Sequence, residues 1–152
     1  MSSIREQIMV LLVAALNSGS SGITGLTVHR ERTRPIEIDS LPAILIYADD
    51  DVPKPLGGQN YAAPLTERQF SLALECRAQG SSSVSPDEAL DPVLMWAAKT
   101  VLANERFGDL ASGAEEGRTV WNSREGDVPV ASAKLSFTIK YRTSRLDPTS
   151  KS

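Results

Sequence analysis

The stretch that decides the fold is residues 130–143, VASAKLSFTIKYRT, in which apolar and polar side chains alternate. Successive side chains of a strand point to opposite faces of a sheet, so this period of two predicts a long strand with one face in the core. The polar set predicts a water-facing side, as in an antiparallel sheet. The inward set is Ala131, Ala133, Leu135, Phe137, Ile139 and Tyr141, and the outward set is Ser132, Lys134, Ser136, Thr138, Lys140 and Arg142.

Other stretches predict partners for this strand. Residues 67–79 alternate in the same way, and residues 41–47 (LPAILIY) form the continuous apolar run typical of a strand covered on both faces. Residues 26–34 alternate more weakly, and residues 119–123 predict a short strand. Two stretches are predicted to be loops, residues 48–64 with their aspartates, prolines and glycines, and residues 107–117.

Two helices are predicted. Ser3 followed by Glu6 is a capping box for a helix over residues 4–16, in which Ile4, Ile8, Leu11, Leu12 and Ala15 form one stripe. Residues 8–16 also resemble the apolar part of a signal peptide, but no positive segment precedes them and no A-x-A site follows. Ser85 and Pro86 begin the second helix, which runs to about residue 104 with an expected kink or restart at Pro92.

The order of these elements, α-β-β-β-α-β-β, predicts the α+β class. We expect a largely antiparallel or mixed β-sheet of about five strands with two main helices packed on one face. Residues 1–148 are predicted to form a single domain, and residues 149–152 a loose C-terminal tail.

Composition excludes several function classes. One cysteine rules out a disulfide framework, and one histidine, His29, removes most zinc and general-base arrangements. A net charge of −3 argues against a dedicated nucleic-acid domain, and the apolar run at residues 8–16 is too short to span a bilayer. We therefore expect no enzyme activity, no cofactor, no metal and no membrane partner.

The remaining candidates are surfaces. Arg30, Arg32 and Arg34 share one side of an extended chain, which favours an acidic partner surface over single-stranded nucleic acid because no aromatic side chain lies among them; a plain exposed strand face is the more ordinary explanation. Asp49, Asp50 and Asp51 could bind a divalent cation, although a solvated acidic loop fits them better. Tyr61 in a predicted loop and Trp96 off the core stripe of its helix are candidate interface aromatics.

The C-terminal string Phe137-Thr138-Ile139-Lys140-Tyr141-Arg142-Thr143, followed by Asp147-Pro148, resembles the final strand of a known family. These are the tail terminator proteins of long-tailed bacteriophages, the lambda U-like minor tail family. The order of the N-terminal helix, the strand opening at Leu41-Pro42-Ala43-Ile44 and the helix start at residues 85–90 is also similar to the family. One departure is the loop Phe107-Gly108-Asp109-Leu110, which has one glycine where the family often has a pair.

This resemblance implies a virion protein that forms a hexameric ring on the head-proximal end of the tail. The ring caps the tube of the major tail tube protein, stops its polymerisation and presents a surface to the head–tail connector or head completion protein. The tape measure protein is a further implied partner, and DNA would pass through the lumen without specific binding. The alternatives are another connector or neck protein and, less favoured, a small α+β ligand-binding or enzyme subunit.

Specific residues follow from this interpretation. The far side of the first helix and the second helix's off-stripe aromatic are candidate subunit contacts, namely Val10, Val13 and Trp96. Candidate surfaces toward the tube or connector are Arg30, Arg32, Arg34, Asp49, Asp50, Asp51 and Tyr61.

Overall fold

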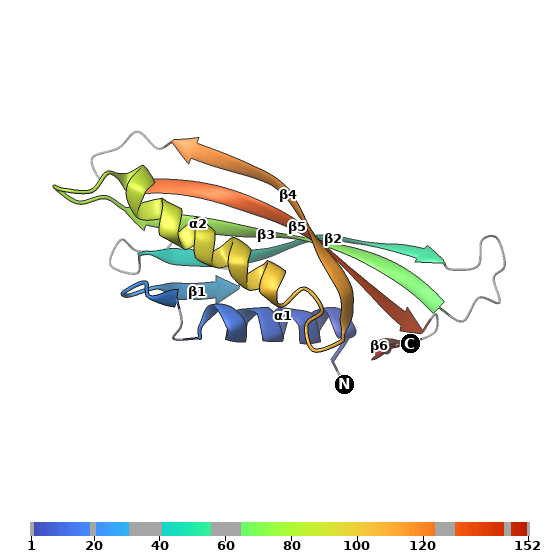
Figure 1. The fold of residues 1–152 in the computed structure, drawn as a ribbon. Helices are drawn as coiled ribbons and strands as arrows, with labels where there is room; N and C mark the ends of the chain where they lie inside the picture. Colours follow the sequence, from blue (N-terminus) through green and yellow to red (C-terminus); the bar gives the residue numbers. More distant parts are fainter. Residues whose placement is uncertain are drawn as a thin grey trace.

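A mixed sheet with two helices on one of its faces makes up the protein (Figure 1). The structure is a computed structural model that describes residues 2–18, 21–30, 41–55, 65–123, 130–144 and 147–151. The elements in chain order are α1 (Ile4–Leu16), β1 (Thr27–Arg30), β2 (Ala43–Pro55), β3 (Leu65–Gln79), α2 (Pro86–Ala103), β4 (Ala111–Ser123), β5 (Val130–Ser144) and β6 (Asp147–Lys151). The sheet order is β1-β2-β3-β5-β4, with β6 also paired to β5. The predicted α+β class is confirmed.

The antiparallel pair β3 and β5 forms the centre of the sheet. It runs in unbroken register from the pair Leu65 and Ser144 to the pair Gln79 and Val130. The predicted alternation is confirmed, because every inward side chain of β5 is buried and the matching face of β3 contributes Phe70, Leu72 and Leu74 to the same core. β1 is parallel to β2, whereas the remaining pairs are antiparallel.

Both predicted helix starts are confirmed by their caps. The Ser3 hydroxyl accepts a hydrogen bond from the Glu6 backbone N–H at 3.1 Å, and the Ser85 hydroxyl accepts one from the Glu88 N–H at 3.2 Å. The predicted restart at Pro92 is wrong, since α2 continues through this residue. Pro92 has no backbone N–H, so the helical hydrogen bond to the Glu88 carbonyl is missing. Both residues are exposed, so water can donate to that carbonyl instead.

The prediction of a loop from residue 48 is wrong for residues 48–55, which continue β2. β1 pairs with β2 only as far as Ile46, so in the described chain the rest of β2 has one open side. Prolines are tolerated on such an edge because no ladder donor is needed there, which explains Pro53 within a strand. Pairing with β3 therefore overrides the turn-forming composition.

The predicted loop at residues 107–117 is likewise wrong from Ala111 onward, where β4 begins. Register shifts after Ala111 and after Glu116 interrupt the alternation of apolar and polar residues that would identify a strand in the sequence. Gly117 lies at the second shift, and a Cβ there would be 3.2 Å from the Ser136 carbonyl oxygen, so a glycine permits this close approach. In the turn before β4, three consecutive residues have positive φ, namely Phe107, Gly108 and Asp109. This conformation is unfavourable for residues other than glycine, and one of the three is a glycine.

The end of the chain also differs from expectation. Residues predicted to be a loose tail include most of β6, which pairs with β5 through Ser144 and Asp147 and through Thr143 and Lys151. The Asp147 carboxylate accepts hydrogen bonds from the Thr149 N–H and hydroxyl, which orders this strand locally.

The core position of Phe70 gives a test of this packing. Phe70→Ala is expected to lower the free energy of unfolding by about 3–5 kcal/mol, because it leaves a cavity between the helices and β3. Val52→Ala, on an exposed part of β2, is the control and should change it by no more than about 0.5 kcal/mol. Denaturant unfolding measures both, and equal losses in the two variants would contradict the assignment of the core.

Candidate functional site

A β-bulge in β2 decides which of the three consecutive aspartates points toward the helices. Ala48 pairs with Leu72 and Asp50 pairs with Ser71, so Asp49 is the extra residue. The alternation reverses at this point, and Asp51, paired with Phe70, lies on the helix-covered face. Asp49 and Asp50 remain exposed.

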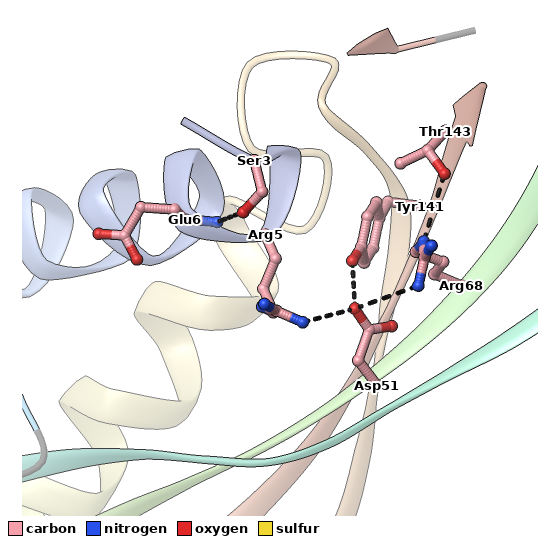
Figure 2. Close-up of polar contacts among 7 residues, drawn as sticks. All are labelled: Ser3, Arg5, Glu6, Asp51, Arg68, Tyr141 and Thr143. Carbon is pink, nitrogen blue, oxygen red and sulfur yellow. Dashed lines mark hydrogen bonds and ion pairs between the residues drawn. The ribbon is translucent and has the colours of Figure 1, made fainter. Parts of the chain in front are cut away.

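Asp51 is the centre of a polar cluster that we call the Asp51 cluster, comprising Arg5, Asp51, Arg68, Tyr141 and Thr143 (Figure 2). Asp51 Oδ2 accepts a hydrogen bond from the Tyr141 hydroxyl at 2.5 Å and one from Arg5 Nη1 at 3.1 Å. Arg68 Nη1 lies 3.9 Å from the same oxygen, while Arg68 Nε donates to the Thr143 hydroxyl at 3.2 Å. The cluster therefore joins α1, β2, β3 and β5.

The electrostatics of the cluster follow from burial. The Asp51 side chain is only 8% exposed, and a buried carboxylate needs opposite charge and hydrogen bonds to remain ionised. The guanidinium groups of Arg5 and Arg68 and the hydroxyl of Tyr141 surround Oδ2. Oδ1 is buried without a hydrogen-bond partner among the described residues. Burial, the hydrogen bond to Asp51 and the negative charge of Asp51 raise the pKa of Tyr141, so its hydroxyl is a donor here and not a base.

A cleft of about 460 Å³ lies beside the cluster and is lined by Arg5, Glu6, Met9, Arg30, Ala48, Asp49, Asp50, Asp51 and Phe70. Across it, the Arg30 guanidinium donates to both carboxylate oxygens of Glu6, at 2.7 and 3.0 Å. The hydrogen bond and charge of Arg30 hold the pKa of Glu6 below its ordinary value. In the described segments, no three His, Cys, Asp or Glu side chains converge as a metal ion would require.

The predicted charged surface is thus divided. Arg30 forms an ion pair with Glu6 of α1, and Asp51 is buried in the Asp51 cluster. Neither charge is therefore available to a partner in the way the prediction requires. Asp49 and Asp50 keep the exposure expected of docking residues. Arg32, Arg34 and Tyr61 lie outside the described residues.

The predicted subunit contacts fare unequally. Val10 is 54% exposed, as expected for a residue on the far side of α1. Val13 is half-buried against the core, and Leu11, expected in the buried stripe, is 42% exposed. Trp96 is a correction, because it packs against the core and its indole N–H donates to the Leu16 carbonyl at 3.2 Å. It joins the two helices within one chain.

Several exposed apolar side chains escaped sequence reasoning. Trp121 is 61% exposed and Val120 lies beside it on β4, while Met95 and Leu102 are exposed on α2. Met95 and Leu102 are seven residues apart and so share one helix face, a signal that was available from sequence. Trp121 carried no such signal, because its exposure depends on which strand ends the sheet.

The family-like motif has structural roles in this chain. Phe137 and Ile139 are core residues, and Tyr141 and Thr143 belong to the Asp51 cluster. Arg142 faces the opposite side of the sheet, at the register position of Glu67. Asp147 and Pro148 lie in β6.

The single cysteine and the single histidine of the sequence are also placed. Cys76 is buried in the core, which raises the pKa of its thiol to about 12, so the thiol is inert as a nucleophile. His29 Nε2 lies 3.0 Å from the Thr27 hydroxyl on β1. Neither of the helices in the described segments has the length and hydropathy needed to cross a membrane.

Comparison with protein-family profiles and with characterised proteins finds no match to this chain.

The Asp51 cluster predicts a large difference between neighbouring aspartates. Asp51→Ala should lower the free energy of unfolding by about 3–5 kcal/mol, because it leaves Arg68 and Tyr141 without their buried partner. Asp50→Ala, one residue away on the exposed side of β2, is the matched control and should change it by no more than about 0.5 kcal/mol. Similar losses at both positions would contradict the bulge-directed burial of Asp51.

The raised pKa of Tyr141 predicts an alkaline pH dependence. The folded chain holds this phenolic proton more tightly than the unfolded chain, so its contribution is complete below the ordinary pKa of 10.0 and is lost as the pH rises above that value. Between pH 9 and 11 the free energy of unfolding should fall more steeply in the unmodified chain than in Tyr141→Phe. Denaturant titrations at stepped pH measure the difference, and parallel curves would contradict it.

Proposed function

We propose that this protein is a ring-forming structural subunit of a phage tail that caps the tail tube and ends its growth. The observation that carries the proposal is the outer face of α1, where Val10, Leu11 and Ala14 are exposed together with no covering element in the described chain. Single exposed apolar residues are ordinary, but a grouped apolar helix face indicates an interaction surface. A closed ring supplies a neighbouring copy to cover it.

The edge of the sheet supports the same proposal. β4 ends the strand order, and an unpaired edge invites uncontrolled pairing with other chains. The first part of β4 has two register shifts and the charged residues Glu115, Glu116 and Arg118. Both features discourage pairing with a strand of another chain. The last part, from Thr119, pairs with β5 in regular register and exposes Val120 and Trp121, as expected of an edge that an assembled neighbour protects.

A projecting part of the sheet is the candidate tube or connector surface. The far ends of β2, β3 and β5 extend past both helices (Figure 1). Lys54, Glu67 and Arg142 form a row of alternating charge across these strands, and exposed Val52 lies on the same face. Growth of the tube would stop because the next tube ring meets a surface that lacks the complementary docking pattern.

Electron microscopy of tails assembled with and without the protein tests this function. Overlong, headless tubes in its absence are expected for a terminator. Tails of normal length that fail to join heads would instead identify a connector or neck protein, and unchanged virions would reject both roles.

The exposed face of α1 gives a prediction about assembly. Val10→Asp should weaken ring formation at least about tenfold, because burying a charge in an apolar contact costs more than about 1.4 kcal/mol. The fold should be kept, because Val10 lies outside the core. Val84→Asp, at another exposed apolar position, is the control. Light scattering over a concentration series measures assembly and circular dichroism measures folding. Normal assembly of Val10→Asp would show that α1 is not a subunit contact. Val13 is avoided because it also packs against the core.

A further inference from the structure

Two β-bulges lie at the same level of the sheet, one on each side of its central pair of strands. In β2, the extra residue Asp49 lies beside the rung of Leu72 of β3. In β4, residues 117 and 118 take up the place opposite a single residue of β5, Ser136. Ser136 pairs with Ala73, which is next to Leu72, so the two bulges lie on neighbouring rungs of the β3–β5 ladder.

The central pair has no bulge at this level. β3 and β5 keep an unbroken register through it, so only the two flanking strands gain a residue here. In a twisted sheet the outer strands wind around the central ones and follow a longer path. An extra residue on each side supplies that length, and a bulge also increases the local right-handed twist. The two bulges therefore concentrate the twist of the sheet at one level.

The twist is visible in the order of the strands (Figure 1). Near the start of α2, β5 lies above β3 and β3 lies above β2, whereas at the projecting ends β2 lies above β3 and β3 lies above β5. The helix-covered part and the projecting part are thus seen from opposite faces of the same sheet. The projecting part turns its open face in a different direction from the rest of the sheet.

This direction is fixed by α1. Arg5 donates to Asp51, which lies two residues beyond the extra residue of β2. Phe70, the register partner of Asp51, is only 1% exposed and belongs to the core. The first residues past the bulge are therefore held against the helix by charge and by apolar packing, so the bulge sets a direction and is not a hinge.

We propose that the paired bulges of β2 and β4 aim the projecting part of the sheet at its docking partner, with Asp49 and Gly117 as positioning residues. The inference deepens the proposed function and rests on it for the identity of that partner. The face that the bulges aim is the one that carries exposed Val52 and the charged row of Lys54, Glu67 and Arg142. In this view the exposed Asp49 acts through the shape of the backbone, and its charge is dispensable.

Deletion of Asp49 separates these two contributions. Ala48 and Asp50 pair with consecutive residues of β3, so the deletion removes the bulge and leaves every other pair of β2 and β3 unchanged. Deletion of any one of the three consecutive aspartates gives the same sequence, which still places an aspartate opposite Phe70. Asp49→Ser is the matched control, because it removes the carboxylate and keeps the extra residue.

Pulsed electron paramagnetic resonance measures the direction of the projecting part. One pair of spin labels joins Met95→Cys on α2 to Lys54→Cys beyond the bulge, and a reference pair joins Met95→Cys to Asn122→Cys within the helix-covered part. All three positions are exposed, and the native Cys76 is buried and escapes labelling. Circular dichroism checks that each variant folds.

Deletion of Asp49 is expected to shift the distance between labels at positions 95 and 54 by about 5 Å. A change of about 20° in direction displaces the end of a strand segment about 17 Å long by roughly that distance. Asp49→Ser should leave this distance unchanged, and the reference pair should be unchanged in both variants. An unshifted distance in the deletion variant, or an equal shift in the reference pair, would overturn the proposal.

A second variant keeps the test decisive where the first deletion prevents folding. Deletion of Gly117 removes the extra residue of β4 and leaves Arg118 to pair with Ser136. It should also shift the distance between labels at positions 95 and 54, because the bulge on the other side of the central pair is lost. An unchanged distance in this folded variant would overturn the joint action of the two bulges.

Tail assembly with the unlabelled variants separates this inference from the proposed function. The folded Asp49 deletion variant should fail to cap tubes, whereas Asp49→Ser should cap them normally. Normal capping by a deletion variant whose distance has shifted would overturn the role of the bulges in docking. Unchanged virions in the complete absence of the protein would reject the terminator function alone, since the distances still decide whether the bulges direct the projecting part.

Discussion

A buried carboxylate can remain charged only where cations and hydrogen-bond donors surround it, and the Asp51 cluster meets that constraint by recruiting four elements. Arg5 comes from α1, Arg68 from β3 and Tyr141 from β5, while Asp51 itself comes from β2. The position of α1 on the sheet is thus specified by charge as well as by apolar contact. Apolar contacts alone would allow α1 to slide slightly along the sheet. The hydrogen bond from Arg5 to the Asp51 carboxylate is directional and would be lost by such a shift.

The bulge at Asp49 makes this arrangement possible. Without the extra residue, the alternation of β2 would direct Asp50 toward the helices and Asp51 toward water. Three identical residues in a row contain no information about which of them is buried. The choice is made by the register with β3, whose residues lie some twenty positions further along the chain.

Regular local patterns were the part of the fold that could be predicted from sequence. The alternation of β3 and β5, the serine caps of both helices and the continuous apolar start of β2 all depend on residues close together in the chain. The predictions for residues 48–55 and 111–117 were wrong because aspartate, proline and glycine favour turns locally, while a long partner strand already in place favours pairing. The candidate contact at Trp96 differed for a similar reason, since this residue lies off the core stripe of α2 but its indole N–H reaches the Leu16 carbonyl on α1.

The sequence by itself determined the class of fold, the faces of its longest strands and the scarcity of nucleophilic and metal-binding side chains. Only the tertiary structure decided which aspartate is buried, which tryptophan is exposed and which apolar side chains of the helices lie open in the described chain. The physical reason is that periodicity and capping are local properties of the chain, whereas burial, register and edge position depend on segments distant in sequence. Trp121 illustrates the division, because its exposure follows from β4 being the last strand of the sheet.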